Sequence, residues 1–290
     1  ESGCGKTSVA MTLLQLQPDN SVITEGSIKL DGKELIGLSE NDLRQVRWNS
    51  ISIVFQGAMN AWNPVIKIGE QIREAMREHY PENSKQENID KINELFKMVG
   101  LDETISDRFP HELSGGMKQR AIIALALSCD PKLVIADEPT TALDVTIQAQ
   151  ILDLLVELRN KLNMAIVLIT HDLGVVARVA DRVVVMYAGQ VVETASVEDI
   201  FENPRMPYTA GLMNSIPRLR SSVNKVRLKA IPGSVPALKD LPSGCRFNPR
   251  CAYTIDLCRA EVPVLEDASD GHLIRCARWR DLNLAQEIAS

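Results

Sequence analysis

Three short runs of apolar residues constrain the fold of this chain more than any other feature. They cover residues 51–55, 133–136 and 165–169, and each is followed at once by polar residues. Such nearly continuous apolar runs, interrupted here only by Ser52, are typical of strands buried on both faces of a parallel sheet. Helical patterns separate the runs, which is the alternation of an α/β fold. The sequence therefore predicts a parallel sheet covered by helices, whose polar strand ends meet at the ligand-binding edge.

The composition changes along the chain and indicates its organisation. The 290 residues suggest roughly two domains, at about 150 residues each. We assign residues 1–200 to the α/β domain, with residues 61–117, which are rich in charge and helix formers, inserted as a helical subdomain. Prolines punctuate the sequence from about residue 201 onward. Residues 201–290 are therefore predicted to form a small C-terminal extension.

Composition and charge exclude several classes of protein. Hydrophobic residues make up 45% and charged residues 24%, which is ordinary for a globular protein and unlike a disordered or fibrous chain. The net charge of -6 argues against nucleic acid or an anionic membrane as the main partner. No apolar run approaches the roughly 20 residues that cross a bilayer, and no signal-peptide pattern is visible.

The chain opens on a glycine-rich segment that ends in Gly5, Lys6 and Thr7. These residues match the last three positions of the phosphate-binding pattern G-x-x-x-x-G-K-[ST]. In such a loop the lysine meets the β- and γ-phosphates and the threonine hydroxyl binds Mg²⁺, while backbone amides surround the phosphate oxygens. The first glycine of the pattern would precede Glu1, so we expect the chain to begin inside the motif. The alternative is an ordinary glycine-rich turn before a helix over residues 8–17.

Two carboxylates follow the strand predicted over residues 133–136. Asp137 and Glu138 would point into the crevice at the carboxyl end of the sheet. Asp137 suits the ligand shell of Mg²⁺, and Glu138 suits a base that orients or deprotonates an attacking water. Without the other motifs, an acidic loop after a core strand would be the simpler interpretation.

The most specific pattern is Leu-Ser-Gly-Gly-Met-Lys-Gln-Arg at residues 113–120. It resembles the signature motif of ATP-binding-cassette (ABC) ATPases. A serine hydroxyl and glycine amides at the start of a helix form an anion site. A plain helix cap with a glycine turn would explain Ser114, but it leaves the rest of the string unexplained.

Nearly the whole chain resembles the ATPase subunits of ABC transporters, specifically the dipeptide and oligopeptide importer branch. Residues 133–138 resemble the Walker B motif, and residues 142–144 resemble the D-loop. Gln56 resembles the Q-loop glutamine, and His171 the switch histidine. Residues 203–209 resemble part of the extension of peptide-importer ATPases. The opening residues resemble the Walker A loop: Ser2, Gly3, Cys4, Gly5, Lys6 and Thr7.

The resemblance implies a site for ATP and Mg²⁺ between two cassettes. It gives catalytic roles to Glu138, Gln56 and His171, and it gives Thr7, Gln56 and Asp137 to Mg²⁺. From position alone, a satisfied histidine at a strand end is the better interpretation of His171, and Gln56 is equally a solvated side chain. The resemblance also implies that the signature motif acts on the ATP of the partner cassette. The further residues implied to contact nucleotide are Ser114, Gly115, Gly116, Gln119 and Asp144. Asp144 is equally explained as a helix cap.

Four of the six cysteines lie close together in the extension, at Cys245, Cys251, Cys258 and Cys276. Since nothing suggests secretion, a metal site is favoured over disulfides. Zinc sites usually show tighter Cys-x₂₋₄-Cys pairs, and the spacing alone leaves metal ligands and free thiols both open. The resemblance implies a [4Fe–4S] cluster on the four cysteines. Zn²⁺ is the alternative metal, with His272 as a substitute ligand.

The resemblance implies an ATP-hydrolysing importer subunit, peripheral to the cytoplasmic face of the membrane. Its implied partners are a second ATPase subunit, itself a paralogue, two transmembrane permease subunits and indirectly a substrate-binding protein. Residues 57–80 would pass the motion to the permease. The rival interpretation is a soluble ABC ATPase acting on nucleic acid or ribosomes, which the single signature motif and the net charge of -6 disfavour. A pure interaction protein with a relic site is disfavoured by the intact set of hydrolytic side chains.

Overall fold

The computed structural model describes residues 3–57, 61–215, 230–269 and 271–289. The chain divides into two compact units. The first unit is Thr7–Thr170, and the second combines Glu1–Lys6 with His171–Ser290. Each unit has a sheet and a hydrophobic core of its own.

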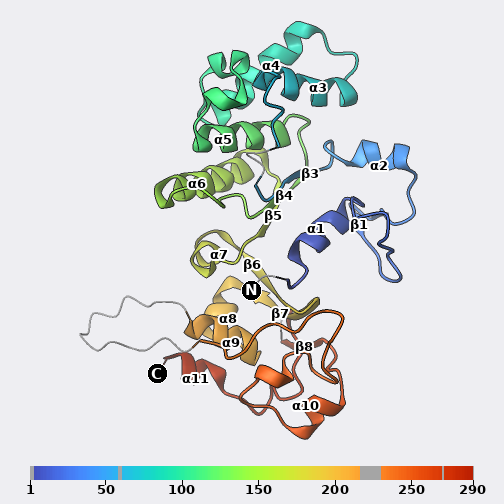
Figure 1. The fold of residues 1–290 in the computed structure, drawn as a ribbon, viewed down its shortest axis with the longest axis vertical. Helices are drawn as coiled ribbons and strands as arrows, with labels where there is room; N and C mark the ends of the chain where they lie inside the picture. Colours follow the sequence, from blue (N-terminus) through green and yellow to red (C-terminus); the bar gives the residue numbers. More distant parts are fainter. Residues whose placement is uncertain (1–2, 58–60, 216–229, 270, 290) are drawn as a thin grey trace, which may run out of the picture. The chain divides into compact units, whose positions relative to one another are not determined.

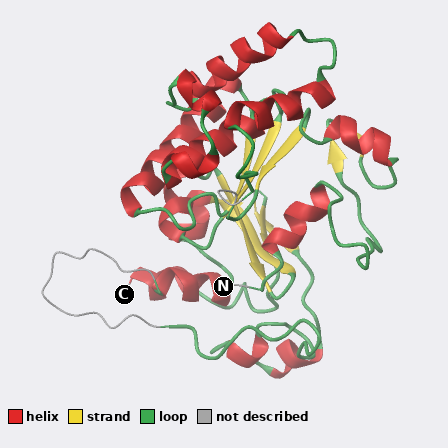
Figure 2. Cartoon of the chain, turned by 45° about the horizontal axis from the view of Figure 1, so that its top comes forward, coloured by secondary structure: helices red, strands yellow, loops and turns green. Residues whose placement is uncertain are grey.

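The first unit is built on a parallel sheet of three strands (Figures 1 and 2). The strands β3 (Ile51–Val54), β4 (Leu133–Asp137) and β5 (Ala165–Ile169) lie side by side in that order. In register, Val54 is opposite Ala136 in the neighbouring strand. The predicted α/β fold with a parallel sheet is confirmed, and its strands are the three apolar runs.

Successive side chains of the sheet enter two different cores, because the pleat turns them to opposite faces. Val134 packs in the larger core, which includes residues of α5 (Gly115–Ala126) and α6 (Val145–Leu162). The next residue, Ile135, packs in a smaller core with residues of α1 (Lys6–Leu13) and α2 (Glu40–Val46). Burial on both faces explains why β3 and β4 are apolar apart from the buried Ser52 and the terminal Asp137. Strand β5 at the edge of the sheet is only partly buried, with Val167 40% exposed.

Helix α1 (Lys6–Leu13) is shorter than the predicted helix over residues 8–17. Gln15 adopts a left-handed φ of 49°, which no helix continues through. Arg47, which follows α2 (Glu40–Val46), holds the chain at this point. Its Nε donates to the carbonyl of Leu14 (2.8 Å), and its Nη2 donates to the carbonyl of Gln15 (2.9 Å). One guanidinium therefore satisfies the carbonyls where the helix stops.

Helices α3 (Ile68–His79) and α4 (Lys85–Met98) lie within the segment predicted to be a helical insertion. A capping box begins α4, with the Ser84 and Glu87 side chains each bonded to the other's backbone N–H. Gly69 of α3 lies so near Ser106 that a Cβ would be 1.8 Å from its hydroxyl oxygen. The other short elements of this unit are β1 (Lys29–Leu30), β2 (Lys33–Glu34), η2 (Glu103–Asp107) and η3 (Pro110–Glu112).

The second unit is built on an antiparallel sheet with the strand order β6-β7-β9-β8. Strands β6 (Arg182–Tyr187) and β7 (Gln190–Ser196) form a hairpin. Strand β9 (His272–Ile274) pairs with β7, and β8 (Glu266–Ser269) pairs with β9, so the C-terminal part of the chain continues this sheet. The helices of the unit are α7 (Leu173–Val179), α8 (Val197–Glu202), α9 (Pro207–Asn214), η4 (Asn248–Arg250), α10 (Asp256–Ala260) and α11 (Leu284–Ala289).

Three aromatic rings form the centre of the second core. Tyr187, Tyr208 and Phe247 have ring centroids 4.7 to 5.3 Å apart. Arg250 is buried beside them, where it donates to the Tyr187 hydroxyl (3.3 Å) and through Nε to the carbonyl of Pro232 (2.7 Å). These partners offset the cost of burying the guanidinium charge. They also join the C-terminal residues to strand β6.

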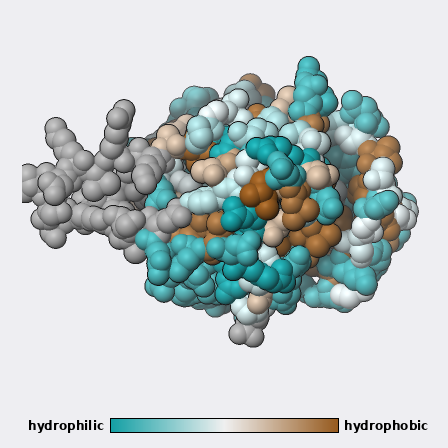
Figure 3. Space-filling model, turned by 90° about the horizontal axis from the view of Figure 1, so that it is seen from below, coloured by the Kyte–Doolittle hydropathy of each residue, from teal (hydrophilic) through white to brown (hydrophobic). Residues whose placement is uncertain are grey.

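The C-terminal residues also carry exposed apolar side chains. Leu257 on α10 is 45% exposed, whereas Cys258 beside it is 8% exposed, so this short helix turns its cysteine inward. Val262 and Val264 follow the helix and are exposed as well. Figure 3 shows patches of apolar surface on the side of the molecule seen from below. In the described part of the chain, no helix is both long and apolar enough to span a membrane.

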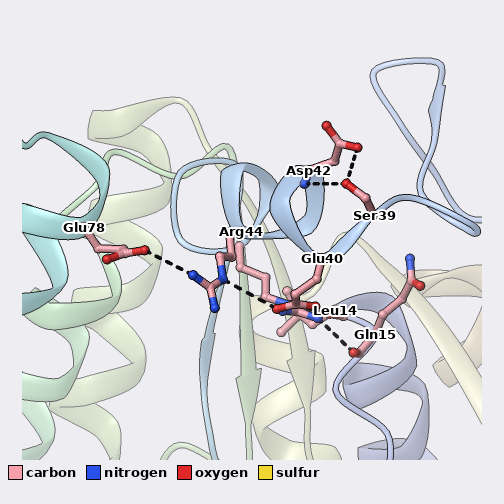
Figure 4. Close-up of polar contacts among 8 residues, drawn as sticks. Leu14, Gln15, Ser39, Glu40, Asp42, Arg44 and Glu78 are labelled. Atoms are coloured by element: carbon pink, nitrogen blue, oxygen red, sulfur yellow. Dashed lines mark hydrogen bonds and ion pairs between the residues drawn. The ribbon is translucent and has the colours of Figure 1, made fainter.

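We expect Arg47→Ala to destabilise the protein more than Arg44→Ala. Both arginines contact Glu40, but the Arg44 side chain is 61% exposed, and its pairs with Glu40 and Glu78 are 3.9 and 3.8 Å long (Figure 4). Exposed pairs contribute about 0–1 kcal/mol, whereas leaving carbonyls unpaired costs about 1–3 kcal/mol. The midpoint of urea unfolding, followed by circular dichroism, measures the difference. Equal midpoints would contradict the role given to Arg47.

Candidate functional site

The carboxyl ends of β4 and β5 meet at one edge of the parallel sheet. Strand β4 ends in Asp137, which lies opposite Ile169 at the end of β5. Glu138 follows with a left-handed φ of 47°, and its N–H donates to the carbonyl of Ile169 (2.9 Å). This conformation is uncommon for residues other than glycine and costs free energy. The chain therefore turns sharply at Glu138, at the edge where α/β sheets bind ligands.

Gln56 lies beside Glu138 at this edge. It follows the end of β3 by two residues, and its Nε2 donates to Glu138 Oε2 (2.8 Å). The two residues are 82 positions apart in the sequence. The parallel sheet thus brings together two of the three side chains that the resemblance connects with hydrolysis.

Asp137 is the most deeply buried carboxylate at this edge. Its side chain is 1% exposed, and its Oδ2 has no hydrogen-bond partner among the described residues. A buried carboxylate oxygen without a donor is costly, and a hard divalent cation such as Mg²⁺ prefers oxygen ligands of this type. The environment of Asp137 therefore fits the predicted Mg²⁺ ligand.

Thr141 is a neighbour of Glu138 that the motifs did not indicate. Its Oγ1 donates to Glu138 Oε2 (3.0 Å), the same oxygen that Gln56 contacts. Residues 138–141 form a four-residue turn in which the N–H of Thr141 donates to the carbonyl of Glu138 (3.1 Å). Pro139 at the second position is the sequence signal that would have found this turn.

The glycine-rich loop has a backbone that only glycine adopts readily. Gly3 and Gly5 have φ values of 78° and 91°, both in the left-handed region. Cys4 between them is buried, and its carbonyl accepts a hydrogen bond from the N–H of Gly189 (3.1 Å). The loop is therefore bound to the β6–β7 turn of its own unit, which holds its shape.

The remaining loop residues begin helix α1. Lys6 and Thr7 are its first two residues, in the turn whose amides have no carbonyl partner within the helix. Such amides favour an anion. Ser2, which the resemblance also assigns to the nucleotide, lies outside the described residues. His171 stands between the end of β5 and Asp172, whose side chain caps helix α7.

Helix α5 begins at the signature-like string. Ser114 is its N-cap, with Oγ accepting a hydrogen bond from the N–H of Met117 (3.3 Å). Gly115 and Gly116 are the first two helical residues. Gln119 is buried, and its Nε2 has no hydrogen-bond partner in the described part of the chain. Ser114 is therefore a helix N-cap, as one of the two sequence interpretations expected. The glycines that follow it line the N-terminus of the helix.

Helix α6 begins beside α5. Asp144 is its N-cap, and Oδ1 accepts a hydrogen bond from the N–H of Ile147 (3.0 Å), so the cap interpretation of Asp144 is correct in this structure. A Cβ on Gly116 would lie 3.0 Å from Ile147 Cγ2. Glycine at position 116 therefore permits the close approach of the two helix starts.

The four clustered cysteines line one small cavity in the second unit. Cys245, Cys251, Cys258 and Cys276 share it with side chains that include Met206. Three of these sulfurs accept hydrogen bonds from the backbone amide two residues further along the chain. Amides directed at sulfur stabilise the thiolate form, which is the form that binds metals. All four thiols are free of disulfides.

Burial opposes the thiolate form at these positions. It raises the pKa of the Cys276 thiol to about 12 and also raises the pKa of Cys245 and of Cys251, because the charged form loses its hydration. In the described residues, no group of three or more histidine, cysteine or acidic side chains is arranged to hold a metal ion. As they lie in the described chain, the four thiols therefore do not converge on one point.

The prediction of His272 as a substitute zinc ligand is wrong for this arrangement, because its side chain is bonded elsewhere. It lies on β9, and its Nε2 is 2.8 Å from Glu193 Oε1 on β7, with both side chains buried. Glu193 also accepts hydrogen bonds from the N–H groups of Arg205 (2.7 Å) and Met206 (3.3 Å). His272 thus provides a hydrogen-bond partner for the buried carboxylate of Glu193. The sequence does not indicate this role, because Glu193 lies 79 residues away along the chain.

Comparison with known proteins agrees with this geometry. A family model described as ABC transporter matches residues 1–141, and one described as Oligopeptide/dipeptide transporter, C-terminal region, matches residues 192–258. The oligopeptide transport ATP-binding protein AppD of Bacillus subtilis is 50% identical, with 97% of this chain and 86% of AppD covered. This chain belongs to the ABC transporter family. The putative peptide import ATP-binding protein BOV_A0348 of Brucella ovis is 47% identical, covering 97% of this chain and 87% of that protein.

Solved ABC cassettes share the fold. The dimeric structure of the cassette MJ0796 in a post-hydrolysis state, bound to ADP and Pi, has a TM-score of 0.59 at 29% identity, covering 68% of this chain and 82% of MJ0796. The structure of cbiO1 from Clostridium perfringens has a TM-score of 0.62 at 28% identity, covering 70% of this chain and 77% of cbiO1. The predicted ABC ATPase is confirmed at the level of family and fold.

We expect Gly116→Ala in the ABC signature to be stabilising only when residue 147 is small. Alanine is better than glycine in a helix by about 0.8–1 kcal/mol, but its Cβ would press on Ile147. A double-mutant cycle with Ile147→Ala should therefore show a coupling of about 0.5–1 kcal/mol. Melting temperatures of the four proteins measure it. Strictly additive effects would show that the two helix starts do not meet.

Proposed function

We propose that this chain is the ATP-hydrolysing subunit of an ABC importer of dipeptides or oligopeptides. The observation that carries the proposal is the pairing of the two matched regions in one chain, an ABC region and a peptide-transporter C-terminal region. The relatives at 47% to 50% identity are named for peptide import or transport. In this proposal residues 1–200 are the ATPase domain, with residues 61–117 as its helical subdomain, and residues 201–290 are the extension.

Hydrolysis in this proposal is the in-line attack of water on the γ-phosphate. Glu138 accepts the proton of the attacking water, Gln56 holds the carboxylate of Glu138, and His171 contacts the γ-phosphate. The hydrogen bond between Gln56 and Glu138 supports the first two roles. The signature motif acts on the partner's ATP: Ser114, Gly115, Gly116 and Gln119, with Asp144 beside them.

Mg²⁺ binds Asp137, Thr7 and Gln56 in this proposal, and when bound it neutralises charge on the β- and γ-phosphates. The orphaned Oδ2 of Asp137 supports this choice. The phosphates themselves lie against Lys6 and the amides of the glycine-rich loop, which also includes Ser2, Gly3, Cys4 and Gly5.

The partners in this proposal are a second cassette, itself a paralogue, two transmembrane permease subunits and indirectly a substrate-binding protein. Permease docking on the segment around residues 57–80 is supported by a groove of about 550 Å³ between α3, α4 and η2. Its lining carries both charges, including Lys67, Arg73 and Asp107. Such a groove suits a polar element of a partner better than an apolar one. The protein then works at the cytoplasmic face of the membrane.

We expect Glu138→Gln to bind ATP and retain it without turnover. The amide keeps the size of the side chain but cannot accept the proton of the attacking water. The rate of phosphate release, and the ATP that stays bound after gel filtration, should be measured on the complete protein assembled with its partners. Glu157→Gln on the exposed face of α6 is the matched control and should keep the normal rate. Normal turnover by Glu138→Gln would refute the assigned base.

We also propose that the four clustered cysteines hold a [4Fe–4S] cluster. The support is the shared cavity and the three amides directed at sulfur. A single zinc ion needs its sulfurs about 2.3 Å from one point. A [4Fe–4S] cluster instead gives each of the four thiolates its own iron. When bound, the cluster supplies a positive centre for the thiolates and one-electron chemistry.

We expect anaerobically purified protein to contain about four irons and matching sulfide per chain. Cys276→Ser should lower both contents, because one ligand is lost. Cys129→Ser is the matched control: this buried thiol lies outside the group of four and should leave the iron content unchanged. One zinc per chain would replace the cluster by a structural zinc site. Absence of metal would refute a cluster and leave the ATPase proposal standing.

A further inference from the structure

The turn after the Walker B strand folds back on its own first side chain. Glu138 is the first residue of this turn and Thr141 the last, closed by the hydrogen bond from the N–H of Thr141 to the carbonyl of Glu138 (3.1 Å). Pro139 fixes its own φ near -65°, which pre-forms such a turn. Because the turn closes within four residues, the Thr141 hydroxyl reaches the Glu138 carboxylate (3.0 Å).

Two donors of different origin meet on one carboxylate oxygen. Glu138 Oε2 accepts a hydrogen bond from Thr141 Oγ1, three residues along the chain. It also accepts one from Nε2 of Gln56, which follows the end of the neighbouring strand β3. A carboxylate held at one oxygen by two donors loses most of its freedom to rotate about its last bond. Of these two donors, Thr141 belongs to the same turn as Glu138, so its contact does not depend on the pairing of β3 with β4.

We propose that Thr141 is a positioning residue for ATP hydrolysis, which acts by orienting the carboxylate of Glu138. This inference rests on the proposed role of Glu138 as the base. In the reaction the water oxygen forms a bond to the γ-phosphorus, and the bond to the bridging oxygen breaks with its electron pair leaving on ADP. The water proton passes to Glu138 and returns with the phosphate product. Thr141 exchanges no proton in this sequence and acts through its hydrogen bond to the carboxylate of Glu138.

The backbone of Glu138 is strained, so contacts such as that with Thr141 are needed to hold the residue in place. A left-handed φ of 47° at Glu138 is held by neighbours, since the residue itself does not favour it. The hydrogen bond from the Glu138 N–H to Ile169 fixes the backbone, and that from Thr141 fixes the side chain. Precise placement of a base matters because general-base catalysis needs hydrogen-bond reach to the water.

Thr141→Val tests the inference because it keeps the side-chain shape and removes the hydroxyl. In the complete protein assembled with its partner subunits, we expect kcat to fall about tenfold while the KM for ATP changes less than about twofold. Thr141→Ser keeps a hydroxyl and should restore the rate to within about twofold of the unmodified protein. A normal kcat for Thr141→Val, or a serine variant as slow as the valine variant, would overturn the proposal.

The Glu138→Gln background separates this inference from the proposed function. There the base is absent, so adding Thr141→Val should not lower the residual single-turnover rate further. A further tenfold loss in that background would show that Thr141 acts independently of Glu138. A normal rate in Glu138→Gln alone would instead refute the base and the present inference with it.

Ser39→Ala is the matched control for loss of a hydroxyl that pairs with a carboxylate. Ser39 Oγ donates to Asp42 Oδ2 (2.6 Å) at the start of α2, among residues that form a polar network of their own (Figure 4). We expect its kcat to equal that of the unmodified protein, and the melting temperature of Thr141→Val to fall no more than that of Ser39→Ala. An equal loss of kcat in both variants would mean that the effect at Thr141 is structural.

Discussion

The parallel pairing of β3, β4 and β5 is the constraint on which the catalytic edge depends. In this register the ends of β3 and β4 bring Gln56 within 2.8 Å of Glu138. A slip of one residue in β3 would move Gln56 by about 3.3 Å and turn each side chain of the strand to the opposite face. The hydrophobic faces prevent that slip, because Val54 and Ile51 of β3 fill two separate cores. Packing in the interior therefore sets distances at the polar edge.

Local patterns in the sequence predicted the parts of this fold that local chemistry decides. The apolar runs predicted the parallel strands, and the glycines predicted a loop that needs positive φ at Gly3 and Gly5. The end of α1 was beyond such patterns, because it depends on Arg47, which is 33 residues away from Leu14. The partner of His272 was likewise invisible, since Glu193 reaches it across a strand pairing. Contacts of this kind come from tertiary structure, which outweighs local preference.

The candidate site divides in the same way. Motif resemblance indicated Gln56 and Glu138, but no motif indicated Thr141, although Pro139 marks the turn that brings it back to the carboxylate. The spacing of the cysteines did not distinguish a cluster from free thiols. Their shared cavity and the amides directed at three sulfurs are features of the folded chain, and they explain how widely spaced cysteines come to line one site.

The cysteine cavity is bound to the sheet of the second unit through buried polar contacts. Cys276 follows β9, and the N–H of Arg275 just before it donates to the carbonyl of Val192 in β7 (2.8 Å). Glu193 next to Val192 accepts from the N–H of Met206, which lines the cavity. Glu193 is also bonded to the N–H of Arg205 and to His272, so a buried carboxylate with several partners ties this part of the chain to β7. The position of the cysteine cavity therefore depends on the packing of strand β7 and on the pairing of β7 with β9.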